Sequence, residues 1–551
     1  MKRDPEALTQ TTFDLAVIGG GIQGAATARE AALRGMKVVL LEARDFGSGT
    51  SSRSTKLIHG GLRYLEQYDF KLVHEARRER QLLMKLAPHL ARPVPFLLPI
   101  YKDDPYSPLK VRLGLTIYDL LGNLGREDRH RMLDPRAALQ ALPALRPDGL
   151  RAAGVYHDSQ TDDARLTLET VLDAAARGAV VLNHTEVRSL ASRGGTSGAG
   201  RDLISAETED QLTGRKYEVS ARFWVNAAGP WVDHVRALVP RYDGSKTVRL
   251  TKGTHLIIPP ITGRYAVLAA IPSDTRVFLI VPWHNCAILG PTDTDFEGDP
   301  ASVRPDRADT EYLLRAANRV LEAPLRVEDV AGSWAGLRAL AVEPRDDRAK
   351  PSALTREYRF HEDAWASNFI SICGGKLTTA RALGEKLTAV VVARLEASGA
   401  LGNRRIPRSG LSTRHVPLPG GQTGAFEPYV NYAAWEAVRL FDVPHPVGER
   451  IVRTYGSRWR KVLERMTADK SLGEPLPGSP TLLAAEVDFA IEEEMALNVE
   501  DFLLRRSGLS WRACMLREAV PAVADIFARR LGWSVPQRDS TVEAFSRSTG
   551  C

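Results

Sequence analysis

The stretch of residues 13–42 constrains the fold of this chain more than any other. A short apolar run is followed by Gly19-x-Gly21-x-x-Gly24, and small residues at helical spacing continue from there to a further glycine. A second apolar run then ends at Glu42. This order of strand, glycine turn, helix and strand is the unit that holds the diphosphate of a dinucleotide.

Each residue of this motif has a physical role. Gly19 permits the tight turn, Gly21 lets the backbone approach the phosphates, and Gly24 lets the helix pack closely on the strands. The amides at the helix N-terminus favour negative charge. Glu42 would accept hydrogen bonds from ribose hydroxyls, so the stretch predicts a domain that binds NAD or FAD.

Composition limits the class of protein. A chain of 551 residues exceeds the size of a single core and predicts two or three domains. Its 44% apolar and 26% charged residues are typical of soluble globular proteins. No apolar run reaches the roughly 18 residues of a membrane span. The polar N-terminus leads directly into the first strand, so we expect no signal peptide.

Charge and cysteine content add further limits. The net charge of +7 is compatible with an anionic substrate, an anionic membrane surface or nucleic acid, and does not choose among them. The basic residues are dispersed among 67 acidic ones without an aromatic-basic motif, so we expect no nucleic-acid partner. The four cysteines lie far apart without CxxC spacing. We therefore expect no metal site, no disulfide framework and a reducing, cytoplasmic location.

The pattern of apolar residues organises the rest of the chain. Residues 66–90 have helical spacing, with Arg77, Arg78 and Arg80 expected on the solvated face. Residues 91–108 are rich in proline and predict an irregular connection. Apolar and alternating runs between 247 and 292 predict a second, mostly antiparallel sheet.

Three further segments favour a flavin over a nicotinamide. Residues 50–64 carry hydroxyls and a glycine pair, which suit a diphosphate, a ribityl chain and the close approach of a flat ring. Residues 225–231 form a strand end of small residues. Residues 373–381 form a glycine turn that opens a helix, whose amide dipoles and Lys376 would face the negative charge of a reduced flavin. Taken alone, each segment is also compatible with a polar loop, a strand end or an ordinary helix start.

The order of these segments resembles the glycerol-3-phosphate dehydrogenase family of flavoproteins, of the respiratory, FAD-linked kind. The run Lys56-Leu-Ile-His-Gly-Gly-Leu-Arg-Tyr-Leu65 is a long and specific match. Other matching stretches are Asp14-Leu-Ala-Val-Ile-Gly-Gly-Gly-Ile22, Asp162-Asp-Ala-Arg-Leu166, Asn226-Ala-Ala-Gly-Pro-Trp231, Lys252-Gly-Thr-His255 and Gly374-Gly-Lys-Leu-Thr-Thr379. The likeness covers residues 13 to about 395 and is fainter from 425 to 535.

Two positions differ from the family pattern. Where the family usually has Gly-Val-Arg-Pro-Leu, this chain has Gly336-Leu-Arg-Ala-Leu340. Ala380 stands where an aromatic residue is commoner. Neither difference removes a charge, so we expect them to alter the fit of the substrate pocket and not the reaction.

The resemblance implies an α/β fold. Its parts would be a Rossmann-like, D-amino-acid-oxidase-like FAD-binding domain, an antiparallel-sheet substrate domain and a C-terminal helical domain. The implied boundaries are 13–90, 150–245 and 340–395 for the FAD-binding domain, 91–149 and 246–339 for the substrate domain, 396–425 for a linker, 426–535 for the helical domain and 536–551 for a tail.

The resemblance also implies a reaction. FAD would oxidise sn-glycerol 3-phosphate to dihydroxyacetone phosphate, with a hydride passing from C2 to flavin N5 and the electrons passing to a membrane quinone. The enzyme would lie in the cytoplasm, peripherally associated with the inner face of the cell membrane. The resemblance is compatible with a monomer or a homodimer. One alternative is an oxidase that uses oxygen as the electron acceptor and makes hydrogen peroxide. The sequence does not distinguish this oxidase from a quinone-linked dehydrogenase. A non-catalytic FAD-binding scaffold would not explain arginines and histidines within glycine-rich segments.

The family pattern assigns residues to the tasks of such a site. Arginine suits phosphate because its planar guanidinium is bidentate and permanently charged. The base needs a pKa near the operating pH, which makes His255 the first candidate and His59 the second. Lys376 would stabilise the forming ketone or the flavin. The implied substrate contacts are Arg63, Tyr64, Arg338 and Arg356, and Arg338 also belongs to the implied catalytic set. The implied FAD contacts are Gly19, Gly21, Gly24, Glu42, Thr50, Ser51, Ser52, Lys56, His59, Gly60, Gly61, Val187, Ala228, Gly229, Gly375, Lys376, Leu377 and Thr378.

Two segments are candidates for contact with anionic lipid. They are residues 109–118, which are apolar with interspersed basic side chains, and the basic run between 453 and 461. A core helix and a solvated basic face are the plainer interpretations of the same residues. The expected membrane contact therefore depends mainly on the family resemblance.

Overall fold

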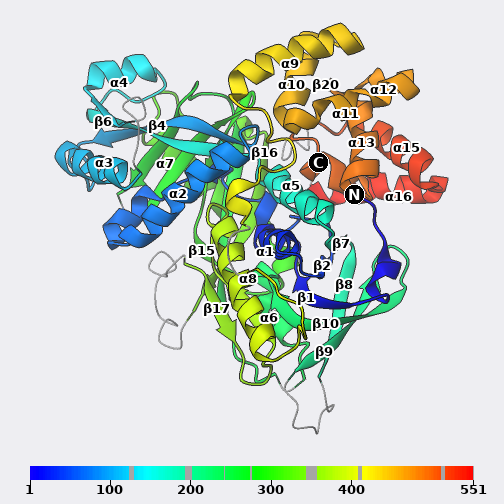
Figure 1. Ribbon diagram of the computed structural model, residues 1–551. Coiled ribbons are helices and arrows are strands. Elements are labelled where there is room, and N and C mark those ends of the chain that lie inside the picture. The colour runs from blue at the N-terminus through cyan, green and yellow to red at the C-terminus, as the bar shows by residue number, and fades with distance from the viewer. Residues whose placement is uncertain are drawn as a thin grey trace.

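The computed structural model describes residues 1–122, 129–192, 202–240, 242–272, 276–342, 357–407, 412–509 and 516–549. Two large sheets form most of the molecule, and helices near the C-terminus gather beside the N-terminal end of the chain (Figure 1). Arg356, Cys514 and Cys551 lie outside the described residues.

Sheet A contains parallel strands in the order β18-β10-β1-β2-β7, extended by the antiparallel strands β17, β9 and β8. The elements of this layer are β1 (Thr12–Ile18), β2 (Val38–Leu41), β7 (Val180–Leu182), β8 (Thr185–Ser192), β9 (Leu203–Asp210), β10 (Lys216–Asn226), β17 (Arg359–Glu362), β18 (Phe369–Cys373), α1 (Ile22–Leu33), α5 (Asp163–Ala176), α6 (Val232–Arg236) and α8 (Ala380–Ala397). Leu15 and Val17 pack under α1, α5 and α8, whereas Ala16 and Ile18 pack on the opposite face with β8 and β9. Burial of both faces explains the nearly continuous apolar run of β1.

Sheet B lies beside sheet A and has ten strands. Its strands and surrounding helices are β3 (Leu57–Ile58), β4 (Ala91–Tyr101), β5 (Arg131–Leu133), β6 (Leu150–Thr161), β11 (Val248–Ile258), β12 (Ala266–Ile271), β13 (Arg276–Trp283), β14 (Cys286–Gly290), β15 (Thr294–Asp295), β16 (Gly332–Ala341), α2 (Phe70–Leu86), α3 (Pro108–Gly122), α4 (Pro135–Ala141) and α7 (Arg307–Asn318). Among the described strands of this sheet, every pairing is antiparallel except that of β12 with β4, which confirms the sheet type predicted for 247–292. β3 and β6 belong to sheet B, although the predicted boundaries gave their residues to the FAD-binding domain.

The prediction of an irregular connection at 91–108 is wrong for its first part, because β4 pairs with β6 along its whole length. Pro93, Pro95 and Pro99 occupy alternate positions of β4. Alternate backbone N–H groups of a strand point to the same side, so three prolines of one parity remove donors from one side only. β12 pairs with the strand only at Phe96 and Leu97.

Of the three arginines of α2 predicted to face solvent, Arg78 is exposed, but the prediction is wrong for Arg77 and Arg80, which are buried. Arg77 places its guanidinium 4.0 Å from the ring centroid of Tyr118 in α3. Arg80 donates from Nε to Ser159 Oγ at 2.8 Å and lies 3.5 Å from the Asp158 carboxylate. These partners come from α3 and β6, so the local spacing of α2 could not reveal them.

The C-terminal region is helical, with one small two-stranded sheet. Its elements are α9 (Phe426–Phe441), α10 (His445–Tyr455), α11 (Trp459–Leu463), α12 (Arg465–Ala468), β19 (Pro475–Leu476), β20 (Ser479–Leu483), α13 (Ala484–Glu494), α14 (Val499–Arg505), α15 (Ala519–Leu531) and α16 (Val535–Thr549). α16 extends to Thr549, beyond the predicted helical limit at 535, because Phe545 is buried in the core of this region.

Short 3₁₀ helices lie within the connections. They are η1 (Pro5–Leu8), η2 (Thr50–Ser52), η3 (Leu62–Gln67), η5 (Gly229–Trp231), η6 (Pro300–Ser302), η7 (Val327–Asp329), η9 (Thr413–His415), η10 (Gly456–Arg458) and η11 (Lys470–Gly473). The connection that carries η9 is fastened to the sheet A layer, because Thr413 Oγ1 donates to the Glu30 carboxylate at 2.7 Å.

The first turn of α1 lies directly against the end of β1. A β-carbon on Gly24 would overlap the carbonyl oxygen of Gly19 and approach the side chain of Ala227 to 3.3 Å. Only a glycine allows this contact between the helix and the turn. The contact holds the free amides of the α1 N-terminus at the carboxyl end of β1.

The close contact can be tested with one methyl group. We expect Gly24→Ala to force α1 away from the turn and to lower the melting temperature by roughly 2–6 °C, as overpacked cores do. At Gly114 of α3 a β-carbon would meet nothing within 4 Å, so Gly114→Ala should leave the melting temperature unchanged or raise it. Equal melting temperatures of both variants, measured by differential scanning fluorimetry, would contradict the contact.

Candidate active site

A cavity of about 1040 Å³ lies between the two sheets. Sheet A contributes the turns that follow the carboxyl ends of β1, β2, β7, β10 and β18, and sheet B contributes side chains of β4, β6, β12, β13 and β16. Open α/β sheets bind ligands at the carboxyl ends of their parallel strands. The volume is at the upper end for small-molecule sites, so an extended cofactor and a small second ligand have room together.

Most of the predicted site residues come together in this cavity. Those that line it are Gly19, Gly21, Glu42, Thr50, Ser51, His59, Gly61, Tyr64, Val187, Ala228, Gly229, Arg338, Gly375, Lys376, Leu377 and Thr378. Arg63 lies in η3 between the cavity residues Leu62 and Tyr64. Arg356 is outside the described residues.

Five predicted residues lie behind the cavity wall: Gly24, Ser52, Lys56, Gly60 and His255. Lys56 is fully buried, forms an ion pair with Asp163 and donates to the carbonyl oxygen of Ser52 at 3.0 Å. It therefore fixes the segment that carries the hydroxyls and does not face the cavity. A β-carbon on Gly60 would overlap the hydroxyl of Tyr118, so this glycine serves packing between segments.

The two candidate bases have different positions. His59 lines the cavity beside Thr378, whereas His255 is buried behind Thr55 with its Nε2 2.9 Å from Thr55 Oγ1. His255 also stacks on Trp334, with ring centroids 5.0 Å apart. Burial, and then the charges of Arg338 and Lys56, lower the pKa of His255 well below its usual value. His255 is therefore neutral near pH 7 and reaches the cavity only through the hydroxyl of Thr55.

Glu42 stands at one end of the cavity, directly after β2. Its carboxylate accepts the N–H of Gly20 at 2.7 Å and of Arg44 at 2.9 Å. Burial raises the pKa of Glu42, and these two N–H donors partly offset that effect. A carboxylate has about four acceptor positions, so lone pairs remain for the hydroxyls of a ribose.

The middle of the cavity is built from glycine turns and hydroxyls. Gly374 and Gly375 have φ values of +78° and +98°, which favour glycine over other residues. Gln23 of α1 donates to the carbonyl oxygen of Gly374 at 2.7 Å and so joins the first turn of α1 to the turn before α8. Ser51 Oγ accepts the N–H of Ile22 at 3.0 Å. Two helix N-terminal regions therefore face this part of the cavity, which favours negative charge there.

The opposite end of the cavity is cationic and is formed largely by sheet B. Arg338 donates to Asp293 at 3.2 Å and to the carbonyl oxygen of Thr292 at 3.3 Å. Arg276 donates to the carbonyl oxygen of Asp293 at 3.1 Å. Lys376 approaches from the turn before α8, with Nζ 3.5 Å from the ring centroid of Tyr64. This grouping of cations can bind an anion.

Further polar residues line the cavity without having been predicted, among them Gln23, Asp158, His184 and Arg276. Thr55 and Trp231 also line it and lie in the predicted segments 50–64 and 225–231. His184 follows β7 of sheet A, so a position directly after a parallel strand is the signal that could have marked it. Asp158 and Arg276 lie on sheet B, where no local motif marks them, because their position depends on the pairing of distant strands.

Comparisons with known proteins agree with this geometry. Residues 14–390 match the family described as FAD dependent oxidoreductase, and residues 411–538 match the C-terminal domain of alpha-glycerophosphate oxidase. An aerobic glycerol-3-phosphate dehydrogenase of Staphylococcus haemolyticus is 34% identical over 97% of this chain and 93% of its own length. Another from Bacillus subtilis is 33% identical over 98% of this chain and 95% of its own.

A solved structure gives the same result. The crystal structure of the glycerol-3-phosphate dehydrogenase from Bacillus halodurans, complexed with FAD, has a TM-score of 0.78 and 30% sequence identity to this chain. The match covers 98% of this chain and 95% of the Bacillus halodurans chain.

The cavity fits the cofactor of the matched family. A β-carbon on Gly21 would meet only Ser51 Oγ within 4 Å, at 3.2 Å. The space on this side of the Gly21 backbone is therefore open to a diphosphate. Glu42 at the end of β2 is placed for a ribose.

A side chain at Gly21 should exclude the cofactor without harming the fold. Its φ of −72° is ordinary for any residue, and the neighbouring space is open. We therefore expect Gly21→Val to fold with a normal circular dichroism spectrum and to be purified colourless. Gly21→Ala should retain part of the flavin, and Gly114→Ala should retain all of it. Full flavin content in Gly21→Val, measured by absorbance, would contradict this position for the diphosphate.

Proposed function

Because this chain belongs to the FAD-dependent glycerol-3-phosphate dehydrogenase family, we propose that it oxidises sn-glycerol 3-phosphate to dihydroxyacetone phosphate and passes the electrons to a membrane quinone. The family, the fold class and FAD as the cofactor, all predicted from the sequence, are confirmed by the matches. The substrate and the electron acceptor are our proposals.

The observation that carries the substrate proposal is the cationic end of the cavity. Arg338, Arg276 and Lys376 line it, and Asp293 lies between the two arginines. Asp158, a further carboxylate of the cavity lining, is 3.5 Å from Arg80 behind the wall. A phosphate dianion at this end could accept charge-assisted hydrogen bonds from these cationic side chains. Glycerol lacks this charge and should bind poorly.

Loss of a hydride from C2 leaves the hydroxyl proton to be removed. FAD, when bound, supplies the acceptor for that hydride. His59 lines the cavity and can take the proton directly, while His255 can take part only through Thr55. Lys376 would stabilise the oxygen of the forming ketone by its charge. We therefore place His59 before His255 as the base, which reverses the order expected from sequence.

The surface of α3 supports the proposed membrane contact. Leu109, Leu113 and Leu120 are 76%, 61% and 77% exposed, and they recur on one side of the helix. Lys110 and Arg112 are exposed beside them. We call these five residues the α3 surface. A helix with exposed leucines and basic residues binds the interface of an anionic bilayer.

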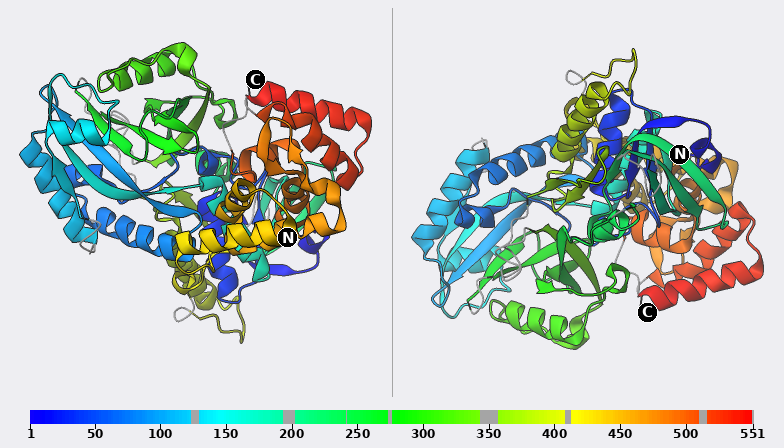
Figure 2. Two further views of the ribbon diagram at one scale, coloured as in Figure 1. Left: turned by 90° about the horizontal axis from the view of Figure 1, so that it is seen from above. Right: turned by 90° about the horizontal axis from the view of Figure 1, so that it is seen from below.

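The α3 surface is connected to the active site through η3. Leu62 and Tyr64 of η3 line the cavity, and η3 contacts α3. The light-blue helices of this part of the chain lie on the side of the molecule away from the red C-terminal helices (Figure 2). The exposed rings of Tyr68 and Phe70 follow η3 directly. A quinone in the bilayer would thus meet an apolar surface next to the cavity. None of the described helices is both long and apolar enough to cross a membrane.

The basic run between 453 and 461 is a weaker lipid candidate. Arg453 pairs with Glu427 and Glu449, Arg458 with Glu494, and Arg460 with Glu436. Trp459 is buried in the core of the C-terminal region. The acidic partners neutralise the three arginines, so the run offers a lipid surface little net charge beyond that of the exposed Lys461.

An oxidase is the second candidate function. The matched C-terminal domain model carries the name of alpha-glycerophosphate oxidase, an enzyme class that returns electrons to oxygen. Its phosphate site would be the same, and only the fate of the electrons would differ.

The phosphate site is tested with Arg338. We expect Arg338→Ala to raise the KM for glycerol 3-phosphate roughly thirtyfold, for a loss of about 2 kcal/mol from a charge-assisted hydrogen bond. The flavin content should stay unchanged. Part of the loss should come from the ion pair that Asp293 loses with Arg338, so adding Asp293→Asn should recover some affinity. Arg249→Ala, on β11 of the same sheet and paired with Asp295, is the matched control. Equal turnover of glycerol and glycerol 3-phosphate by the parent enzyme would refute a phosphate site.

The acceptor and the membrane contact are tested together. We expect a soluble quinone analogue to be reduced much faster than oxygen, with little peroxide. Leu113→Glu combined with Leu120→Glu should abolish binding to anionic vesicles while leaving the rate with the soluble analogue unchanged. Leu212→Glu, on the exposed β9–β10 turn, should bind vesicles as the parent does. Stoichiometric peroxide without quinone reduction would favour the oxidase instead.

A further inference from the structure

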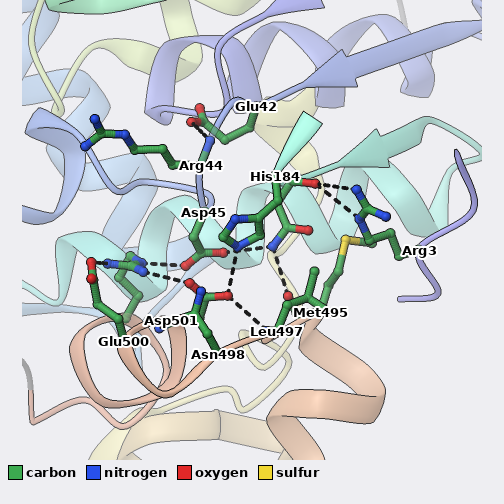
Figure 3. A network of polar contacts seen from close by, with 12 residues as sticks. Arg3, Glu42, Arg44, Asp45, His184, Met495, Leu497, Asn498, Glu500 and Asp501 are labelled. Atoms are coloured by element: carbon green, nitrogen blue, oxygen red, sulfur yellow. Dashed lines mark hydrogen bonds and ion pairs between the residues drawn. The ribbon is translucent and has the colours of Figure 1, made fainter. Parts of the chain in front are cut away.

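His184 lies on the turn between β7 and β8, next to Glu42 at one end of the cavity (Figure 3). Its N–H donates to the carbonyl oxygen of Arg44 at 2.7 Å, and the N–H of Thr185 donates to that of Glu42 at 2.8 Å. The two segments that carry Glu42 and His184 are thus joined through their backbones.

The backbone of His184 is in the left-handed region, with φ of +50°. For a residue other than glycine this conformation costs roughly 1–2 kcal/mol. The position is held on both sides, because the N–H of Gln211 donates to the carbonyl oxygen of His184 at 2.8 Å. Glycine would adopt this conformation without strain. The presence of histidine at such a position suggests a functional role for its side chain.

The side chain of His184 has its partner in the C-terminal region. Its Nε2 lies 3.1 Å from Oδ2 of Asp501 in α14 (Figure 3). Asp501 is fully buried and also accepts from Arg505 at 2.9 Å and from the N–H of Leu497 at 2.9 Å. These bonds fix the carboxylate, so the ring of His184 is held beside Glu42 by an element more than three hundred residues away in sequence.

A second buried contact fastens the same end of the cavity. Asp45, three residues after Glu42, accepts from Arg505 Nε at 2.5 Å and from Arg506 Nη2 at 2.8 Å. The ligand atoms of Asp45, His184 and Asp501 lie within 4.8 Å of one another, a spacing that a metal ion could bridge. The two arginines already balance both carboxylates, so the cluster needs no cation.

The charges around the turn favour the protonated form of His184. They are Asp501 and Arg505 of α14, Asp45, Arg44 and Glu42 of the segment after β2, and Arg3 and Asp210 near Asn183. Burial opposes the charge, but Asp501, and then Asp45, outweigh burial and raise the pKa of His184, against a smaller effect of Arg505. The charge of His184 in turn favours the ionised form of Glu42, whose pKa burial raises.

We propose that the C-terminal helical region takes part in cofactor binding: Asp501 holds His184 as an imidazolium beside Glu42, and this charge strengthens the binding of the adenosine end of FAD. The inference rests on FAD binding and is independent of the substrate proposed above. His184 keeps its charge below its raised pKa and loses it as the pH rises through that value. FAD should therefore dissociate faster at higher pH.

The test measures the rate of FAD release from the holoenzyme, by the appearance of free-flavin fluorescence, between pH 5.5 and about 9, the range that spans an ordinary and a raised histidine pKa. In the parent, release should accelerate with a single titration. In His184→Gln, which keeps a donor for Asp501 without the charge, release should be about tenfold faster at low pH and independent of pH. Asp501→Asn should move the titration to lower pH, since His184 loses its anionic partner.

Glu500→Gln is the matched control. Glu500 lies on α14 and pairs with Arg505 at 3.2 Å, so this variant changes a carboxylate of the same helix without touching His184. It should release FAD as the parent does. A parent rate that does not vary with pH, or a His184→Gln profile equal to that of the parent, would overturn the proposal. Equal effects of Glu500→Gln and Asp501→Asn would overturn it as well, because they would indicate general loosening of the helix.

A binding measurement checks the same charge without relying on rates. FAD should bind the apoprotein with uptake of a fraction of a proton near neutral pH, measured by calorimetry in two buffers of different ionisation enthalpy. His184→Gln should take up none. This measurement compares only the parent and His184→Gln, so it tests the proposal even if Asp501→Asn fails to fold.

Discussion

The close approach of α1 to the turn after β1 is the constraint on which the rest of the site depends. Gly24 lies so near the carbonyl oxygen of Gly19 that a single methyl group would not fit. This contact sets the helix N-terminus at the end of β1, where its amides favour negative charge. Glu42, the hydroxyls of η2 and the glycine turn before α8 are then arranged around the same point, and Gln23 joins that turn to α1.

The parts of the molecule that sequence predicted are those fixed by local chain geometry. The unit of β1, α1 and β2 could be predicted because turn, helix and acid follow one another within thirty residues. Most of the glycine and hydroxyl segments line the cavity for the same reason. The predictions failed where the packing of distant elements decides the outcome: β4 pairs with β6 despite its prolines, and Arg77 and Arg80 are buried.

Cavity residues such as Arg276 and His184 were missed for a related reason. Each stands beside its partners only after the sheets have formed, and the partner of His184 comes from α14. Charged residues pair across elements in this molecule, as Arg338 does with Asp293 and Arg165 with Glu494. A single sequence contains the charges but not the pairing, so roles that depend on pairing can be assigned only from the structure.

The proposed activity depends on the binding of a phosphate at the cationic end of the cavity, next to a FAD site. Its most direct test is anaerobic mixing of the purified yellow protein with sn-glycerol 3-phosphate, with the flavin absorbance followed in time. The account predicts rapid and complete bleaching by glycerol 3-phosphate, and bleaching by glycerol, at equal concentration, that is slower by orders of magnitude. Absence of bleaching by glycerol 3-phosphate, or equal rates with both compounds, would contradict it.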